Sequence, residues 1–477
     1  MTMLSVPENF VAIGQAAHTV DAAFSLVNDP KRQTHLLVSG NISGFSGTSH
    51  GESMICPLTL ENARALAKRL PWLTPRRIPE GQPSFGFGDR LGLATPGHVR
   101  SLARVGVFPI FAQQSVREND RTGRSFADVL ADATFGVFRE GYDQGFGADA
   151  DHLKELDDVR DAASVGFTFF TCDPGDHVQE TEGMNSSQLA IAFDALPNAK
   201  DWRKRYLDRT FQIGTDLILR FGQDELYRAA VKYGGAIDHA ANMYAELTKL
   251  LPKGFDYEVS VDETTSPTTP LEHLFVALEL RHRKVDFVSL APRFVGAMEK
   301  GVDWRGDLDQ FTKDLIAHAA IAKCVSGYRL SLHSGSDKFS LYELMAKTTG
   351  GYCHVKTAGT SYLVTLDVLS RNEPKLFREI AEFSLAAFAE DKATYHISAD
   401  VSRIPALESV TDAELPGLVD AHDSRQVLHV AYGSVLNSPL GARLVDAIVR
   451  LEEAHLDALA AHLGRHIQGL GGGDAHE

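Results

Sequence analysis

The sequence has little cysteine and no long apolar run, and each shortage argues against a class of protein. Only four cysteines occur in 477 residues, and no two of them have the CxxC spacing of a zinc or redox site. This pattern favours reduced thiols and a cytoplasmic location. No apolar run approaches the roughly 20 residues that cross a bilayer, and residues 1–28 lack the charged and apolar segments of a signal peptide. We therefore expect a cytoplasmic protein with neither leader nor membrane anchor.

Basic clusters and nucleotide-binding motifs are also missing. The net charge is −16 at pH 7 and no basic run stands out, which argues against nucleic acid as a partner but not against a small anionic substrate. Gly86, Gly88 and Gly92 resemble a dinucleotide-binding loop, but the third glycine comes one residue late and no ribose-binding acid follows. There is no Walker loop and no GxSxG elbow. We expect no nucleotide cofactor.

What the sequence does contain is a repeated alternation of strand-like and helix-like segments. Eight strand-like runs, mostly separated by helical stretches, lie at 84–90, 107–114, 146–152, 167–173, 257–263, 287–294, 328–333 and 352–356. Such alternation indicates parallel strands with crossover helices. Eight units favour a closed (β/α)8 barrel over an open sheet, and the polar residues cluster at the carboxyl ends of the runs, where a barrel carries its active site. We predict an α/β protein built on this barrel.

Three regions surround or extend the barrel. Residues 1–80 are predicted to form a small N-terminal α/β segment, with a strand near 34–39 and a helix near 58–70, followed by a proline-punctuated linker. The barrel is expected over 81–370, with a helical insertion at 186–252. Residues 371–477 are expected to form a helical C-terminal extension packed on the barrel. No long internal repeat is visible.

Histidines at the strand ends predict a metal site. His177 follows the fourth run, His333 follows the seventh, and His354 lies inside the eighth. Three imidazoles can hold a divalent ion and leave a position open for substrate. Zn²⁺ is the default, with Mn²⁺ or another first-row ion as the alternative. His152, after the third run, is a fourth candidate, for which a surface histidine that starts a helix is an equal alternative.

Carboxylates beside these histidines are candidates for proton transfer. Asp176 directly precedes His177, which would place a proton acceptor next to a metal-bound substrate. The competing interpretation is an aspartate that caps a turn beside an exposed histidine. Asp262 and Glu263 end the fifth run, and one of them should face the barrel mouth because neighbouring side chains alternate sides. Glu263 could be a second acid or base, a metal ligand, or a salt-bridge partner.

Positive and amide groups converge on the same ends. Barrels commonly bind anions beside strands seven and eight, and the hydroxyl-rich loop 356–362 suits a phosphate or a sugar carboxylate equally. Arg121 and Arg124, in the loop after the second run, are as consistent with a solvated loop as with function. The residues predicted to bind substrate are Asp89, Arg90, Gln113, Gln114, Lys338, Lys356, Thr357 and Ser361.

Several long motifs resemble one family. They are FGFGDRLG (85–92), FPIFAQQSVREN (108–119), RTGR (121–124), GFGADADH (145–152), SVDET (260–264), LHSGSDKFS (332–340), HVKTAGTSYL (354–363), YHISAD (395–400) and YGSVL (432–436). Together they resemble the tagaturonate/fructuronate epimerase family of bacterial hexuronate C4-epimerases, from about residue 80 to 470. The resemblance implies a divalent-metal barrel enzyme that interconverts D-tagaturonate and D-fructuronate in galacturonate catabolism.

The implied reaction constrains the chemistry. C4 of a 2-ketose is not adjacent to the carbonyl, so inversion requires either transient oxidation, for which no nicotinamide site is visible, or cleavage and re-formation of the C3–C4 bond. The second route is a retro-aldol step, in which a base takes the C4 hydroxyl proton and a metal stabilises the enediolate. Metal-dependent barrel aldolases are similar, with an Asp-His pair and a small-residue loop after a late histidine. By that analogy Asp176 is the base, and His177, His333 and His354 hold the ion. Glu263 would transfer the proton on the opposite face of the substrate.

Three other functions stay open at this point. A metal-dependent sugar isomerase or 3-epimerase would require two opposed glutamates, and only Glu263 is well placed. A true aldolase would differ only in releasing its aldehyde fragment. A catalytically inactive sugar-binding barrel is disfavoured by the clustering of histidines and carboxylates at strand ends. The oligomeric state and the preferred direction of reaction cannot be read from the sequence.

Overall fold

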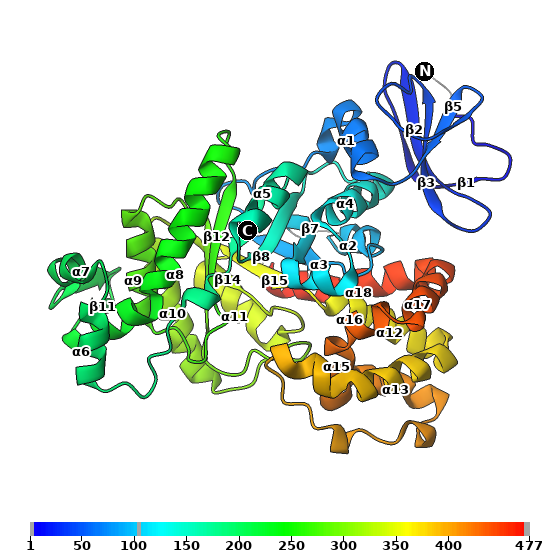
Figure 1. The fold of residues 1–477 in the computed structure, drawn as a ribbon. Coiled ribbons are helices and arrows are strands. Elements are labelled where there is room, and N and C mark those ends of the chain that lie inside the picture. Colours follow the sequence, from blue (N-terminus) through cyan, green and yellow to red (C-terminus); the bar gives the residue numbers. More distant parts are fainter. Residues whose placement is uncertain (1–3, 103–105, 472–477) are drawn as a thin grey trace, which may run out of the picture.

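The predicted barrel is confirmed by the computed structural model, which describes residues 4–102 and 106–471. Eight parallel strands close on themselves, because the last strand pairs with the first. In order around the barrel they are β6 (Ser84–Gly88), β7 (Phe108–Ser115), β8 (Gly147–Leu153), β9 (Phe169–Cys172), β12 (Asp256–Val261), β13 (Ser289–Pro292), β14 (Arg329–Leu332) and β15 (Cys353–Thr357). The barrel lies at the centre of Figure 1.

Helices connect consecutive strands and surround the barrel. They are α2 (Thr95–Ser101), α3 (Val116–Thr122), α4 (Phe126–Glu140), α5 (Leu156–Val165), α8 (Gln223–Leu250), α9 (Pro270–His282), α10 (Leu308–Cys324) and α11 (Phe339–Thr349). Helix α12 (Thr360–Asn372) follows the last strand, β15, and leads into the C-terminal helices. Local signals fix their ends. The Ser125 hydroxyl and the Asp128 carboxylate cap each other's backbone N–H groups at the start of α4, and Gly141 ends that helix in the left-handed conformation. Because neighbouring barrel strands are parallel, each connection returns the chain to the amino end of the next strand.

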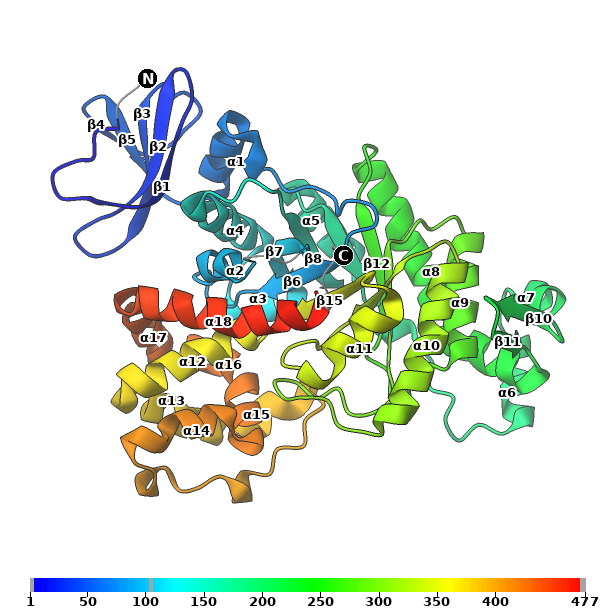
Figure 2. The same ribbon diagram turned by 180° about the vertical axis from the view of Figure 1, so that it is seen from behind.

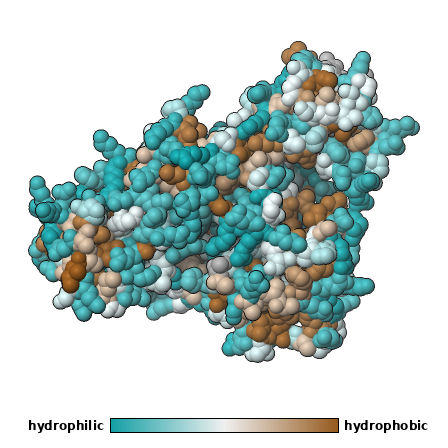
Figure 3. All heavy atoms as spheres, in the orientation of Figure 1, coloured by the Kyte–Doolittle hydropathy of each residue, from teal (hydrophilic) through white to brown (hydrophobic). Residues whose placement is uncertain are grey.

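The segment between β9 and β12 contains more than the helices expected there. It begins with α6 (Ser186–Asp194) and α7 (Ala199–Tyr206), and α8 then serves as the crossover helix. Between α7 and α8 the chain forms an antiparallel hairpin of β10 (Thr210–Ile213) and β11 (Leu217–Arg220). Figure 3 shows a hydrophobic patch at the edge of the molecule where these elements lie, and Ile191 and Ile218 are 73% and 64% exposed.

The N-terminal region contains a five-stranded antiparallel sheet, where the sequence had indicated a single strand. The strands lie in the order β1 (Val11–His18), β2 (Ala22–Asn28), β3 (Thr34–Gly40), β5 (Ser53–Cys56) and β4 (Thr48–His50). Helix α1 (Leu60–Arg69) follows the sheet, close to the expected position. The sheet projects to one side of the barrel, beyond α4, in both ribbon views (Figures 1 and 2). Its strands pair only with one another and add nothing to the barrel.

Helices after β15 pack against the barrel and bring distant parts of the chain to its mouth. They include α13 (Pro374–Asp391), α14 (Leu415–Asp420), α15 (His422–Val430), α16 (Tyr432–Leu436), α17 (Pro439–Arg450) and α18 (Glu452–Leu470). Helix α18 returns along α12, α2 and α11, as Figure 2 shows. A second hydrophobic core, which includes Leu369, Phe377 and Leu444, joins α12 to these helices. Among the described helices, none combines the length and apolar character of a membrane span.

Candidate active site

A pocket opens at the carboxyl ends of the barrel strands. Its wall combines strand ends with residues from the C-terminal helices. The lining residues include Gln113, Asp151, His152, His333 and Lys356 from the strand ends, Arg90, Arg117, Glu118, Lys300, Ser334 and Ser336 from the loops and helices that follow, and Tyr395 and His429 from beyond the barrel. An adjoining groove of about 490 Å³ shares Lys300, His333, Ser334 and Tyr395 and adds Asp262 and Glu263.

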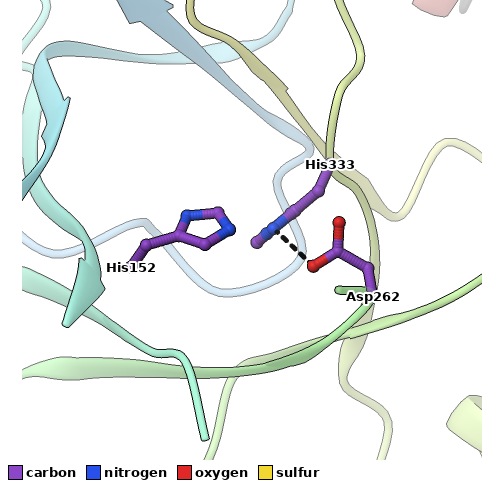
Figure 4. A group of neighbouring side chains, drawn as sticks. All are labelled: His152, Asp262 and His333. Carbon is purple, nitrogen blue, oxygen red and sulfur yellow. Dashed lines mark ion pairs between the residues drawn. The ribbon is translucent and has the colours of Figure 1, made fainter. Parts of the chain in front are cut away.

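Two histidines and an aspartate converge where the pocket and groove meet. His152 lies near the end of β8, Asp262 follows β12 and His333 follows β14. One potential ligand atom from each lies within 4.8 Å of the other two, and Figure 4 shows both other side chains directed toward the imidazole of His333. We call these three residues the mouth group.

Neighbouring carboxylates orient both imidazoles of the mouth group. His333 Nε2 donates a hydrogen bond to Glu258 Oε1 at 2.6 Å, which leaves Nδ1 facing Asp262 Oδ1 at 3.4 Å. His152 Nδ1 lies 2.8 Å from Asp151 Oδ1. Burial alone would lower the pKa of His333, but Glu258 and Asp262 outweigh it and raise the pKa to about 10. Without an ion the ring is therefore protonated at neutral pH, and a bound ion would take the place of the Nδ1 proton. A carboxylate behind a ligating histidine is the usual support of a metal site, because it fixes the ring and its tautomer.

The donor set of the mouth group fits a divalent first-row ion. Two imidazoles and one carboxylate form the protein ligand set of several catalytic zinc sites, which keep a further position open. The 3.4 Å separation of Nδ1 and Oδ1 matches the roughly 3.3 Å edge of a tetrahedron with bonds of about 2.0–2.1 Å. The open side faces the pocket and the groove. His152, Asp262 and His333 are therefore the residues that could hold an ion.

The family of this chain follows from comparison with known proteins. A family model described as tagaturonate epimerase matches residues 10–470. The chain belongs to the tagaturonate epimerase family. It is 49% identical to the tagaturonate/fructuronate epimerase of Thermotoga maritima over 418 residues, which cover 87% of this chain and 86% of that protein.

Solved structures agree with this assignment. The fructuronate-tagaturonate epimerase UxaE from Cohnella laeviribosi, with one glycerol bound, superposes with a TM-score of 0.92 at 35% identity, covering 96% of this chain and 95% of that one. Its native crystal structure gives the same values. The relatives are named as epimerases over nearly their full length, so this member of the family is an enzyme of the isomerase class, as the resemblance had implied.

A buried network beneath the mouth group involves the predicted residue Lys356. Lys356 Nζ lies 2.7 Å from both Asp149 Oδ2 and Asp151 Oδ1 and 3.0 Å from Glu258 Oε1. Burial lowers the pKa of Lys356, but these carboxylates more than offset it and raise the pKa. Burial raises the pKa of Asp149 to about 7. Lys356 thus lines the pocket, but its charge is already neutralised by protein carboxylates.

The three histidines that the sequence indicated as metal ligands are not brought together in this epimerase. His177 is exposed in the turn after β9, where its ring stacks on His239 with centroids 4.1 Å apart. His354 is buried in the barrel, with Nδ1 2.9 Å from Ser84 Oγ, and burial lowers its pKa to about 3. Among the residues the structure describes, neither belongs to a group of three potential ligands, whereas His333 does.

Of the two residues predicted to transfer protons, Glu263 lies at the site and Asp176 does not. The Asp176 side chain is 71% exposed and pairs with Lys154 Nζ at 3.1 Å, outside the lining of the pocket and the groove. Glu263 lines the groove and lies 3.4 Å from Arg117 Nη2. Burial raises the pKa of Glu263, but His152 and Arg117 outweigh burial and lower it.

Of the eight residues predicted to bind substrate, Arg90, Gln113 and Lys356 line the pocket. Gln113 Nε2 donates to Thr357 O at 2.9 Å, and Arg90 Nε donates to Glu118 Oε1 at 2.9 Å. Lys338 is fully buried, and its ammonium donates to the backbone carbonyls of Glu299, Val302 and Ser336. Lys338 therefore holds loops together and does not face the pocket.

Three of the other four predicted residues have structural contacts, whereas neither side-chain amide atom of Gln114 has a hydrogen-bond partner among the described residues. Asp89 accepts hydrogen bonds from three backbone N–H groups at the start of the β6–α2 connection. Thr357 Oγ1 donates to Gly86 O, and Ser361 Oγ donates to Gly88 O, so both tie β15 and its loop to β6. Gln114 is buried and does not line the pocket or the groove.

Sequence reasoning missed Asp151, Glu258 and Lys300 and did not single out Asp262 from Glu263. A signal existed for the first, because Asp151 and His152 form a second Asp-His pair at the end of a predicted strand. Asp262 was considered beside Glu263, but the side that each would face could not be settled. Glu258 sits inside a strand, and Lys300 lies in a loop of no particular composition, so nothing in the sequence distinguished them.

Proposed function

We propose that this epimerase interconverts D-tagaturonate and D-fructuronate, the sugar acids for which its Thermotoga and Cohnella relatives are named, and that it requires a divalent metal ion. The observation that carries the proposal is the mouth group, which opens on a pocket lined by cations in a member of this family. The ion held by His152, Asp262 and His333 would act as a Lewis acid that stabilises negative charge on the ketone half of the substrate.

The reaction we propose is cleavage and re-formation of the C3–C4 bond. A base removes the C4 hydroxyl proton, the C4 oxygen becomes an aldehyde, and the C3–C4 electron pair moves to C3 to give an enediolate with C2. The aldehyde half turns about C4–C5, C3 attacks its opposite face, and the proton returns to the C4 oxygen. Atoms and electrons balance without an oxidant, and the C4 hydrogen never leaves its carbon.

Asp151 is our candidate for the base. It lines the pocket, is 5% exposed and lies beside the mouth-group residue His152. Burial raises the pKa of Asp151, but His152 and Lys356 outweigh burial and hold the pKa well below its usual range. The carboxylate is therefore ionised at neutral pH, which is the form that a general base requires. Glu263, which lines the groove, is our candidate for proton transfer on the opposite face of the substrate.

Lys300 and Arg117 are our candidates for binding the substrate carboxylate. Both line the pocket, and Lys300 also lines the groove. Lys300 Nζ donates to Ser334 Oγ at 2.7 Å, which places the ammonium beside the loop after His333. In the proposed cleavage the carboxylate stays on the aldehyde half, so a cation that holds it would keep this half bound while it turns.

The test is an assay of D-fructuronate labelled with deuterium at C4, with Zn²⁺ or Mn²⁺ and without nicotinamide. We expect D-tagaturonate that retains the label, and loss of turnover after chelation with recovery on adding the ion. Loss of the C4 label to water would contradict bond cleavage and favour proton transfer at C4. Full activity after exhaustive removal of metal would contradict the metal requirement.

A further inference from the structure

His429 is a buried histidine of the pocket wall to which the proposed reaction assigns no role. It lies on α15 in the C-terminal helices and is 2% exposed, yet it lines the pocket together with Gly301 and Gly359. Its backbone carbonyl accepts a hydrogen bond from Arg90 Nη1 at 3.2 Å, which fixes the end of α15 against the loop after β6. The imidazole thus reaches the pocket from a helix that lies outside the barrel.

Neither ring nitrogen of His429 has a hydrogen-bond partner among residues 4–102 and 106–471. The other buried histidines of this region are held: His98 Nε2 lies 2.8 Å from Ser361 Oγ, His455 Nε2 lies 2.9 Å from Thr365 Oγ1, and His466 Nε2 accepts from the Asp337 N–H. A buried polar group without a partner is destabilising, and a retained one calls for an explanation. A ligand in the pocket would provide the missing partner.

The position of Gly359 supports a site built around this imidazole. Gly359 has φ −103° and ψ −5°, a conformation that any residue adopts, so backbone geometry does not require glycine there. A Cβ atom at residue 359 would lie only 2.0 Å from Cε1 of His429. The absence of a side chain at 359 therefore makes room for the ring, and a mutation there would displace it.

The surroundings of His429 favour an uncharged imidazole. Burial lowers its pKa well below the usual value, and the nearby cations Arg90, Lys300 and Arg425 lower it further, against the opposing effect of Asp337. A neutral imidazole has one donor and one acceptor. A sugar hydroxyl also both donates and accepts, so it matches the ring, whereas a carboxylate only accepts and has cations available nearby.

We propose that His429 is a substrate-binding residue whose imidazole hydrogen-bonds a hydroxyl group of the sugar acid and holds the aldehyde half in the pocket. This inference rests on the proposed function, because it takes a hexuronate as the ligand. It assigns to the C-terminal helices a direct part in the site, since the pocket formed by the barrel alone would lack this contact.

The first test uses binding without turnover. L-galactonate, a hexonate in which a hydroxyl replaces the ketone, is added to wild-type protein with ¹³Cε1-labelled histidine. We expect a shift of the His429 resonance, which is assigned from its absence in His429→Gln. A His429 resonance that stays unchanged at saturating L-galactonate would overturn the inference, as would failure of the wild-type protein to bind L-galactonate in calorimetry.

The second test compares three variants. His429→Phe keeps a ring but has no nitrogen, His429→Gln restores a donor and an acceptor, and Gly359→Ala leaves the imidazole but displaces it. Affinity for L-galactonate should fall about 2- to 13-fold in His429→Phe and Gly359→Ala, and less in His429→Gln, since a neutral hydrogen bond contributes about 0.5–1.5 kcal/mol. Circular dichroism and metal content serve as controls for folding.

Turnover separates this inference from the proposed function. If both hold, His429→Phe should release free three-carbon fragments during epimerisation more often than wild type. If the wild-type protein binds L-galactonate and shifts the His429 resonance but does not epimerise D-fructuronate, the proposed function fails and His429 still binds a sugar acid. If epimerisation occurs and His429→Phe has wild-type affinity and no fragment release, only the inference about His429 fails.

Discussion

Two clusters in this protein each contain two histidines and one aspartate, but they lie in different surroundings. The mouth group is His152, Asp262 and His333, and a second group, which we call the helix group, is Asp337, His462 and His466. Both place potential ligand atoms within 4.8 Å of one another. The mouth group opens on the pocket and the groove, whereas no member of the helix group lines either of them.

The ligand atoms of the helix group are occupied by protein partners. His466 Nε2 accepts the Asp337 N–H at 3.0 Å and its Nδ1 donates to His462 O at 3.1 Å. Asp337 Oδ1 accepts from His462 Nε2 at 2.6 Å, and Oδ2 accepts from Arg425 Nη2 at 2.9 Å. The group fastens α18 and α15 to the loop after His333. Residue type and spacing thus do not distinguish a reactive group from a structural one, whereas access to the pocket and the groove does.

The largest effect that separates the two groups should be on metal. In His333→Ala the mouth group loses one of three ligands, so we expect loss of bound zinc and of measurable turnover. His466→Ala should keep wild-type metal content, because its ring nitrogens are used by the protein. Elemental analysis of both variants after incubation with Zn²⁺ measures this. Equal metal loss in both would remove the distinction, and stoichiometric metal in His333→Ala would contradict the ligand assignment.

A second comparison concerns the two Asp-His pairs. Asp151→Asn keeps the size of the side chain but removes the proposed base, so turnover should fall by roughly 10²–10⁴. Asp176→Asn affects an exposed residue paired with Lys154 and should change turnover little. Steady-state rates with saturating metal measure both effects. Near-normal turnover in Asp151→Asn would move the base role to another carboxylate, with Glu263 as the next candidate.

The two lysines near the Ser334–Lys338 loop allow a similar comparison. Lys300→Met should raise KM for D-fructuronate by about 10- to 150-fold, because a charge-assisted hydrogen bond contributes about 1.5–3 kcal/mol. For the uncharged ketose D-fructose the same variant should bind no worse than wild type. Lys338→Met should instead reduce stability, since three backbone carbonyls lose their donor. Equal effects of Lys300→Met on both sugars would exclude Lys300 from the carboxylate site.

The smallest expected effect is on the pH dependence of stability. Burial lowers the pKa of His466 to about 4 in the folded protein, against about 6.5 in the unfolded chain. Between these values the unfolded state binds a proton at His466 that the folded state does not, so the contribution of His466 to the free energy of unfolding decreases as pH falls from 6.5 to 4. Asp149, whose pKa is raised to about 7, contributes with the opposite sign and is unchanged in the variant below. The slope is about 1.4 kcal/mol per pH unit for one histidine.

Urea denaturation at pH 7, 6 and 5 measures how the free energy of unfolding changes with pH. His466→Gln should remove the contribution of one proton from this slope. His98 and His455, whose pKa burial also lowers to about 4, contribute with the same sign and remain in the variant. The pKa of Asp337 is lowered as well, but the stability that it provides is lost only below about pH 4, outside this window. An unchanged slope in His466→Gln would show that His466 is not held neutral.

The sequence by itself determined the barrel and the family. The alternation of strands and helices depends on neighbouring residues, so all eight strands and most of the helices between them could be located from the sequence. The exception is α3 (Val116–Thr122), which lies where the sequence predicted a loop that contains Arg121. The family motifs are contiguous stretches, and the family match covers residues 10–470. His333 could also be found, because it directly follows a strand at the end where a barrel carries its chemistry.

Only the tertiary structure decided which side chains share the site. His152 lies at the end of β8 and His177 lies in the turn after β9, and each stands next to an aspartate. His152, with φ +50°, lines the pocket, whereas His177 is exposed. The two lysines differ similarly, because Lys338 is buried and donates to three backbone carbonyls, whereas Lys300 lines the pocket. His429 reaches the barrel from α15, and His462 and His466 of the helix group reach it from α18, around 95 to 135 residues after His333. Such contacts depend on how helices pack and on which way loops turn, and neither is encoded in local spacing.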